Sequence, residues 1–561
     1  MPNPSLAAEG LTAEFVAELR SRIHTLILPG AEAYFQAGET AYSRGNAGSK
    51  PIEMAQGYYD YQPCGVSTLG ELAAGGEERA LRVVQHIFNN TREYVTGWGE
   101  KEGYRFPLRR LLLHLALCYE RLHAHVPAET SAEWHETLGL TGENVLAHFN
   151  RFQERVPALD NRGFGTGINH VALGAEGVWK AGEVLGRADW QALAGDFNDR
   201  LIAYSHPDGY FEEHTNDERE GGPSLNYTPL TAGSAYIIQC WRNAVDRARF
   251  ARCGALYRSL TDAGLRAMAF ADERTNPHGL GPYGLAIHSL TPEGRGFLRM
   301  ALDAETGTGV LGRANLQTLS RINFELDYVD LGEGALPEPF QDGTFRITMP
   351  LGVARFNGWT CGLFAMRALN RVVSPRGDYA LDRQNLLYLS HAEAGVILSG
   401  AKSKYDPLWS TVRVGDDAYP VRTGTLEMTA DRAVAEVFYE TFSVELTWTF
   451  GAEPRLVMVS DAEGPLTAQL VLEVVPDSAL CLDGARTVEL GDDELRLDCT
   501  SVATDTWTLA ADRPGAVVWP ISPFNPYSAG NKSAPRSRRP LFVAEWTDRI
   551  AFVFRANGAG K

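Results

Sequence analysis

The sequence lacks several features that would place it in a specialised class. Its seven cysteines are scattered over 561 residues without a CxxC pair, so a zinc site built from cysteines is not expected. No uncharged apolar run approaches the length of a membrane-spanning helix, so no membrane partner is expected. The N-terminal segment has no basic stretch followed by an apolar one, which predicts a cytoplasmic protein without a secretory signal.

Basic residues are also fewer than acidic residues. The chain has 52 Lys and Arg against 70 Asp and Glu, and its formal net charge is -18. A broad basic surface for nucleic acid is therefore not expected. If the substrate is acidic, a local group of arginines has to bind it. The sequence does not indicate an oligomeric state.

The first half of the chain is predicted to be helical. Apolar residues recur every three to four positions in eight segments, which are separated by short polar or Gly/Pro stretches. The chain shows no fixed repeat of the tetratricopeptide or ankyrin kind, which favours a closed arrangement of helical hairpins. We therefore expect an incomplete α/α toroid over residues 1–310. The eight segments are 12–28, 77–95, 108–126, 134–152, 168–186, 190–205, 230–245 and 247–270.

The pattern changes near residue 310. Short alternating segments rich in Val, Thr, Leu and aromatic residues follow, bounded by Gly, Asp and Pro. The first is 321–331, and longer examples are 425–450 and 486–512. They predict an antiparallel β-sandwich over residues 311–561. The stretch 337–343 is the expected linker.

The predicted helix within residues 165–186 carries an unusual number of glycines. Gly174, Gly177 and Ala181 form a bare stripe that follows His170 at helical spacing. Each interior glycine is about 1 kcal/mol less favourable than alanine, so the stripe should have a purpose. It allows close approach of another helix or of a ligand. Asn169 and His170 form a polar pair at the start of this helix.

A second polar stretch, residues 206–236, separates two predicted helices. It is rich in Asp, Glu, His, Arg and Gly, and loops held between rigid elements often carry functional sites. A charged surface loop is the competing interpretation. The candidate residues are Asp208, Glu212, Glu213, His214, Arg219 and Tyr227.

These two stretches resemble motifs of the heparinase II/III-like polysaccharide lyases and the related alginate and oligoalginate lyases. "NHVALGAEGVWKAG" (169–182) is similar to a helix of that family, and "DGYFEE" (208–213) with "SLNYTPL" (224–230) is similar to the loop that carries its catalytic tyrosine. Ile168 stands where the family has its first asparagine, and Glu176 falls one residue from the family's glutamate. An α/α toroid followed by a β-sandwich is also that family's layout.

The resemblance implies β-elimination at a 4-linked uronic acid in a poly- or oligosaccharide. In this interpretation Asn169 and His170 neutralise the sugar carboxylate, and Tyr227 acts as general acid and could also act as base. "LSHAEAGVILSGAKSKYDPLWSTVR" resembles the family's β-domain region, and it would add His391 and Tyr405. No cofactor is required for this chemistry, and a structural divalent metal is not indicated.

Further residues are candidates for substrate binding. Arginines and a histidine near the two motifs could stabilise the tyrosine as phenolate or bind the carboxylate. Aromatic residues in the loop 94–106 could stack on a sugar ring, although burial at the toroid rim is the slightly favoured alternative. These residues are Arg162, His214 and Arg219, and Trp98, Tyr104 and Arg105.

Three other functions remain open on the sequence alone. A glycoside hydrolase needs two carboxylates, which Asp208, Glu212 and Glu213 could supply. A uronate C5-epimerase starts with the same proton abstraction but ends by reprotonation. A non-catalytic carbohydrate-binding protein would not depend on the hydroxyl group of Tyr227.

Overall fold

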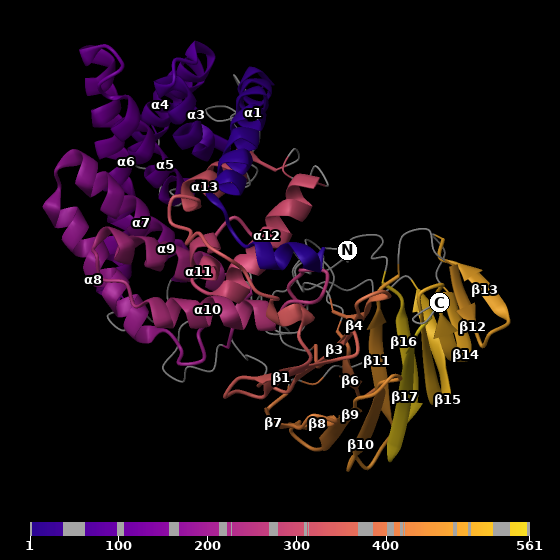
Figure 1. Ribbon diagram of the computed structural model, residues 1–561. Coiled ribbons are helices and arrows are strands. Elements are labelled where there is room, and N and C mark those ends of the chain that lie inside the picture. Colours follow the sequence, from indigo (N-terminus) through magenta and orange to yellow (C-terminus); the bar gives the residue numbers. More distant parts are fainter. Residues whose placement is uncertain are drawn as a thin grey trace.

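The structure is a computed structural model with a helical N-terminal half and a β-sheet C-terminal half. The two halves lie side by side in Figure 1, with the helices in indigo through magenta to salmon pink and the strands in salmon pink through orange to yellow. The described residues are 3–37, 62–97, 106–155, 168–212, 222–225, 227–268, 279–307, 311, 314–367, 385–400, 409–415, 419, 421–474, 479–491, 495–519 and 539–557.

The helical half consists of α-helices joined by short connections. Three 3-10 helices accompany them in the described part of the chain: η1 (Pro4–Glu9), η2 (Gln62–Gly65) and η4 (Glu338–Phe340). The α-helices are α1 (Ala13–Ala37), α3 (Val66–Ala74), α4 (Glu78–Gly97), α5 (Phe106–Leu122), α6 (Ala128–Arg155), α7 (Ile168–Leu185), α8 (Ala188–Tyr204), α9 (Thr228–Trp241), α10 (Arg247–Ser259), α11 (Leu285–Ser289), α12 (Pro292–Gly307) and α13 (Leu316–Glu325).

Alternate helices form the inner ring of a toroid. Along α3, α5, α7, α9, α11 and α13, each helix packs against the next, and α13 packs back against α3. The Ser320 hydroxyl of α13 donates to Thr68 Oγ1 of α3 at 2.9 Å. The helices α4, α6, α8, α10 and α12 cover this ring from outside. The predicted toroid is confirmed, and its inner ring is thinnest at α11, which has only five residues.

Two of the secondary-structure predictions are wrong. Residues 321–331 begin as the helix α13 and not as a strand, because Asn315 caps the helix by accepting from Thr318 N at 2.8 Å. The predicted helix 247–270 ends at Ser259. There Asp262 accepts from Arg266 N at 2.9 Å and turns the chain, and Leu265 has a positive φ of 57°.

The β half consists of antiparallel strands. Their bounds are β1 (Gly343–Arg346), β2 (Leu351–Phe356), β3 (Trp359–Phe364), β4 (Leu387–His391), β5 (Gly395–Ser399), β6 (Thr411–Arg413), β7 (Thr423–Met428), β8 (Arg432–Phe438), β9 (Ser443–Thr449), β10 (Arg455–Ser460), β11 (Leu466–Leu472), β12 (Ala479–Leu482), β13 (Arg486–Glu489), β14 (Leu495–Ala503), β15 (Trp507–Trp519), β16 (Leu541–Trp546) and β17 (Arg549–Ala556).

The strands form two layers that share β15. One layer runs from β1 through β2, β3, β4 and β5 to β11, β16 and the end of β15. The other runs from the start of β15 through β17, β10, β9 and β8 to β7. Apolar side chains of both layers, including Trp359, Leu446 and Phe552, form one core between them. The predicted antiparallel β-sandwich is confirmed.

The first strands of the sandwich dock against the toroid. The buried Arg355 of β2 donates from Nη2 to the carbonyl oxygens of Ser259 and Thr261, at 2.7 and 2.9 Å. The Tyr388 hydroxyl of β4 donates to Asp262 Oδ2 at 2.8 Å. The chain therefore turns after α10 where the sandwich meets it.

The helices continue beyond residue 310, since α13 ends at Glu325, and the predicted linker 337–343 leads into β1. The division of the chain into domains at residue 310 stays a prediction. Within the described ranges, no helix is both long and apolar enough to span a membrane.

Candidate active site

Asn169 and His170 lie in the first turn of α7. The Asn169 side chain is completely buried, and its amide nitrogen and oxygen have no hydrogen-bond partner among the residues that the structure describes. A buried amide without a partner destabilises a fold by about 1–3 kcal/mol, and such groups commonly face a ligand or an ordered water. His170 is partly exposed beside it.

Tyr227 immediately precedes α9 and is half-buried. Its backbone N–H donates to Ser224 O at 3.1 Å, and its carbonyl accepts from Thr231 N at 2.9 Å. The Thr228 hydroxyl donates to Phe211 O at 3.0 Å and ties this corner to the preceding loop. The backbone at Tyr227 is therefore held by its neighbours without using its hydroxyl group in any of these bonds.

Two contacts show how α7 and α9 lie against each other. Leu173 and Leu230 belong to one small apolar cluster, and Ser234 Oγ donates to Glu176 Oε2 at 2.9 Å. The second contact lies three residues further along α7 and four further along α9, so the helices run parallel. Asn169 lies one helical turn before Leu173, and Tyr227 lies one turn before Leu230. We therefore infer that Asn169 and Tyr227 are level with each other at the N-terminal ends of the two helices.

A buried ion cluster lies further along these helices. Arg321 Nη1 donates to both carboxylate oxygens of Glu176 at 2.8 Å, and Arg321 Nε donates to Glu325 Oε1 at 3.0 Å. All three side chains are at most 1% exposed. Burial raises the pKa of Glu325, while Arg321 and the backbone N–H of Gly284 oppose that rise. Because α7 and α13 are joined here, Glu176 holds α7 to two other inner helices.

Two histidines are buried in the same ring of helices. His114 Nδ1 lies 2.7 Å from Ser67 Oγ, and burial, followed by the charges of Arg321 and Arg110, lowers the pKa of His114 to about 3. Burial and Arg258 lower the pKa of His288 well below its usual range. Both side chains are therefore neutral in the folded protein at neutral pH.

The burial of His114 predicts that the free energy of unfolding falls in acid. Between pH 6.5 and about 3, the unfolded chain binds a proton at His114 and the folded chain does not, so stability falls as the pH falls. The expected contribution is about 1.4 kcal/mol per pH unit for each such histidine. Chemical denaturation at pH 7, 6 and 5 should therefore show a steeper loss for the wild type than for His114→Gln.

The comparison with His114→Gln is the informative quantity, because the raised pKa of Glu325 acts in the opposite direction. Both proteins contain Glu325, so its contribution cancels in the difference of the two slopes. Equal slopes for the two proteins would show that His114 does not resist protonation in the fold.

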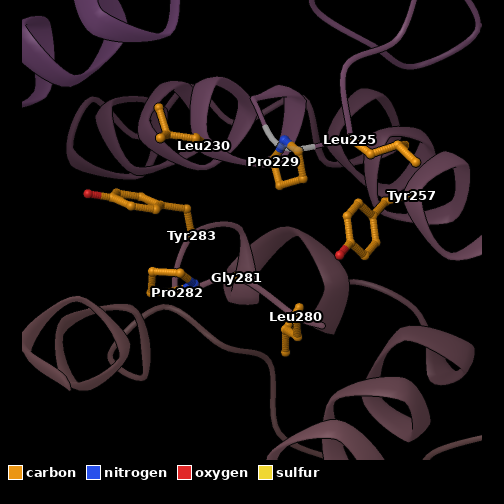
Figure 2. A pocket seen from close by; sticks show the side chains of 8 residues that line it. All are labelled: Leu225, Pro229, Leu230, Tyr257, Leu280, Gly281, Pro282 and Tyr283. Carbon is orange, nitrogen blue, oxygen red and sulfur yellow. The ribbon is translucent and has the colours of Figure 1, made fainter. Parts of the chain in front are cut away.

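A cavity of about 240 Å³ adjoins the corner that carries Tyr227. Leu225, Pro229 and Leu230 line one side of it, Tyr257 of α10 lines another, and residues 280–283 complete the lining (Figure 2). Leu225 and Pro229 lie two residues before and after Tyr227 in the chain. Leu173 of α7 contacts the cluster of Leu230 and Tyr283, so the cavity also lies close to α7.

Two glycines of α7, Gly177 and Gly182, lie in close contact with neighbouring helices. A Cβ atom on Gly177 would lie 3.1 Å from Leu112 Cβ and Leu113 N of α5. A Cβ atom on Gly182 would lie 3.0 Å from Arg187 O and Trp190 Cβ. Neighbouring helices and not a ligand therefore occupy the space over these two residues.

His391 lies at the end of β4 within the sandwich. Its Nδ1 accepts from Glu393 N at 3.2 Å, and its ring lies 4.8 Å from that of Trp359. Burial lowers the pKa of His391. These contacts hold the β4–β5 turn, and a catalytic role for His391 stays a prediction.

Asp208 connects the loop before Tyr227 to the sandwich. Its Oδ2 accepts from Thr348 N at 2.9 Å and lies 3.3 Å from His206 Nδ1. The carboxylate therefore has a structural role, which weakens its case as one of a hydrolase's two acids. Glu212, which follows Asp208 by four residues in the sequence, has a buried side chain.

The remaining predicted site residues lie outside the described part of the chain. They are Trp98, Tyr104, Arg105, Arg162, His214, Arg219 and Tyr405, and also Glu213 of the hydrolase alternative. Their roles stay predictions. In the described ranges, no group of three or more His, Cys, Asp or Glu side chains is placed to hold a metal ion.

Comparison with solved structures identifies the fold. The sequence matches no family model and no curated protein. A crystal structure of heparinase III is similar to the chain with a TM-score of 0.55 and 11% identity, covering 88% of this chain and 76% of that one. A second heparinase III structure gives a TM-score of 0.52 at 11% identity, with the same coverage of both chains.

A second enzyme shares the architecture. The chondroitin AC lyase of Streptomyces coelicolor A3, solved in complex with chondroitin sulphate, has a TM-score of 0.53 and 15% identity. The match covers 97% of this chain and 83% of that one. Both halves of the chain are therefore included. This chain has the polysaccharide-lyase fold that heparinase III and chondroitin AC lyase share.

Proposed function

We propose that the protein is a lyase that cleaves a 4-linked uronic acid in a poly- or oligosaccharide by β-elimination. The observation that carries the proposal is the buried amide of Asn169, which has no partner among the described residues. The packing of α7 against α9, from which we infer that Asn169 is level with Tyr227, supports it. The fold supports it, because heparinase III and chondroitin AC lyase have the same architecture.

The proposed mechanism uses three side chains. Asn169 and His170 donate hydrogen bonds to the uronate carboxylate, which makes the C5 proton more acidic and stabilises the negative charge that develops. Tyr227 transfers protons: ionised, it accepts the proton from C5, and as a phenol it donates one to the departing O4 oxygen. The electron pair of the C5–H bond forms the C4–C5 double bond as the C4–O4 bond breaks.

A substrate panel tests the proposal. The purified protein is incubated with uronate-containing polysaccharides and oligosaccharides, and the ultraviolet absorbance of the C4–C5 double bond is followed. We expect absorbance to grow with at least one substrate. New reducing ends without this absorbance would favour a hydrolase, and inversion at C5 without cleavage would favour an epimerase.

The variant Asn169→Leu tests whether the side chain of Asn169 is needed for catalysis or for the stability of the fold. Because the described residues offer the amide no hydrogen-bond partner, an apolar side chain of similar size should leave the melting temperature unchanged or raise it. Loss of the donor should lower kcat by about 10²–10³-fold. A folded variant that keeps full activity would remove Asn169 from the mechanism. A variant that unfolds would show that the amide is needed for the structure.

A further inference from the structure

Residues 206–212 form a compact turn between α8 and the corner before α9. The backbone N–H of His206 donates to Tyr210 O at 2.8 Å, and the two rings stack with their centroids 4.3 Å apart. Gly209 has a positive φ of 99°, and a Cβ atom there would lie 2.8 Å from the carbonyl oxygen of Arg252 in α10. The turn is therefore held by its own contacts and packs directly on the backbone of α10.

The sandwich holds this turn at two points. The backbone N–H and the hydroxyl group of Thr348 both donate to Asp208 Oδ2, at 2.9 and 2.5 Å. The Tyr210 hydroxyl donates to the sulfur atom of Met349 at 3.0 Å, and the Tyr210 side chain is fully buried. Thr348 and Met349 are consecutive residues between β1 and β2. Hydrogen bonds to a carboxylate are stronger than those between neutral groups, so the attachment at Asp208 is the firmer of the two.

The same turn contacts the corner that carries Tyr227. The carbonyl oxygen of Phe211, the residue after Tyr210, accepts from the Thr228 hydroxyl at 3.0 Å. The Thr228 N–H also donates to Ser224 O at 2.7 Å. Phe211 and Thr228 are both buried. Because closely packed residues leave no space to absorb a shift, a displacement of the turn is passed to Thr228 and to Tyr227, which is bonded to it.

The proposed chemistry requires such a fixed position. A proton passes between two groups only when their heavy atoms lie about 2.6–3.2 Å apart. A misplacement of about 1 Å can therefore lower the rate by about 10²-fold, even when the changed residue is far from the reacting atoms.

We propose that Asp208 is a positioning residue: bound to Thr348, it fixes the place of the Tyr227 hydroxyl group relative to Asn169. The inference rests on the proposed function. The sandwich then contributes to catalysis through a contact that involves no reacting atom, and the helical half alone does not complete the site.

Kinetic constants separate positioning from substrate binding. Asp208→Ala should lower kcat by about 10–10²-fold and leave KM within about twofold, because the proposed sugar contacts of Asn169 and His170 remain. Thr348→Val keeps the backbone donor and should lower kcat less, by about three- to tenfold. Asp208→Asn keeps an acceptor oxygen and should stay within about threefold of the wild type. A carboxylate that reacts would not be replaced by asparagine.

A double variant and a matched control identify the contact. Asp208→Ala combined with Thr348→Val should be as active as Asp208→Ala alone, because both changes break the same contact. Tyr388→Phe also removes a hydroxyl that donates from the sandwich to an aspartate of the helical half, Asp262. It should lower the melting temperature and keep kcat within about twofold of the wild type, since this aspartate lies outside the turn.

Fluorine NMR tests the same contact without a substrate. Protein that contains fluorotyrosine gives a resonance for Tyr227, which is assigned by its absence in Tyr227→Phe. We expect Asp208→Ala and Thr348→Val to shift or broaden this resonance, and Asp208→Asn and Tyr388→Phe to leave it unchanged. Thr348 is exposed, so Thr348→Val provides the test even if Asp208→Ala does not fold.

Each result decides the inference. An unchanged Tyr227 resonance in Thr348→Val overturns it, with or without cleavage of a substrate. In a protein that cleaves uronate, it is also overturned by wild-type kcat in Thr348→Val, by an equal loss in Tyr388→Phe, or by an Asp208→Asn variant as inactive as Asp208→Ala. A displaced resonance in a protein that cleaves no uronate contradicts the lyase proposal and leaves the positioning contact supported.

Discussion

Tyr227→Phe is expected to lower kcat/KM for β-elimination by about 10²–10⁴-fold while the protein stays folded. The substitution removes the only group of this side chain that can transfer a proton. It keeps the ring, and the chain direction at this corner depends on the backbone bonds of Tyr227 and on the Thr228 hydroxyl. Ultraviolet absorbance of the unsaturated product measures the effect.

Two controls accompany this variant. Tyr419→Phe removes an exposed hydroxyl from the sandwich and should have wild-type activity. The melting temperature of Tyr227→Phe should match that of the wild type, which separates loss of chemistry from loss of structure. Activity within tenfold of wild type would show that another residue transfers the proton.

Arg321→Met is expected to destabilise the protein by about 3–5 kcal/mol. The change leaves the carboxylates of Glu176 and Glu325 buried without the guanidinium group that pairs with both. It also removes the contact that joins α7 to α13 and the cation over Tyr283. Chemical denaturation followed by the helical circular dichroism signal measures the loss.

Two further variants show whether the buried charge is responsible. Arg422→Met breaks the ion pair with Glu440 on the surface, where such pairs contribute at most about 1 kcal/mol. The triple variant Glu176→Gln, Arg321→Met, Glu325→Gln removes all three charges and should recover part of the stability that Arg321→Met loses. If the single and triple variants are equally unstable, packing and not charge explains the effect.

The arrangement of helices and strands could be predicted where one face of an element is exposed. Strand β8 alternates buried and exposed residues, which is the pattern expected for a strand with one solvated face. The inner helix α13 gives a conflicting signal. Leu316, Leu319 and Ile322 recur at helical spacing, but from Ile322 to Tyr328 every second residue is apolar. That alternation is the pattern of a strand, so the sequence predicts a strand over residues 321–331.

Because residues 321–331 are predicted as a strand, the ion cluster could not be predicted either. Arg321 and Glu325 are four residues apart, which places them on one face only if the segment is helical. Glu176 lies 145 residues away from Arg321 in the sequence, so no local pattern indicates their contact. The same holds for Tyr257 and Tyr283, which line the cavity from two separate segments.

The polar ends of α7 and α9 could be predicted as a candidate site, because Asn169 and His170 stand at the start of an apolar helix and Tyr227 ends a polar loop. Their relative position could not, since it depends on the contacts of Leu173 with the Leu230 cluster and of Glu176 with Ser234. The bare stripe allows two roles, packing of another helix or approach of a ligand. At Gly177, the contacts with Leu112 and Leu113 of α5 decide in favour of helix packing.

The most direct test of the proposed chemistry is the stoichiometry of the products. For a substrate that the protein cleaves, new reducing ends and C4–C5 double bonds are quantified in the same reaction. β-Elimination predicts one double bond for each new reducing end throughout the time course. Reducing ends that accumulate without double bonds would contradict the account.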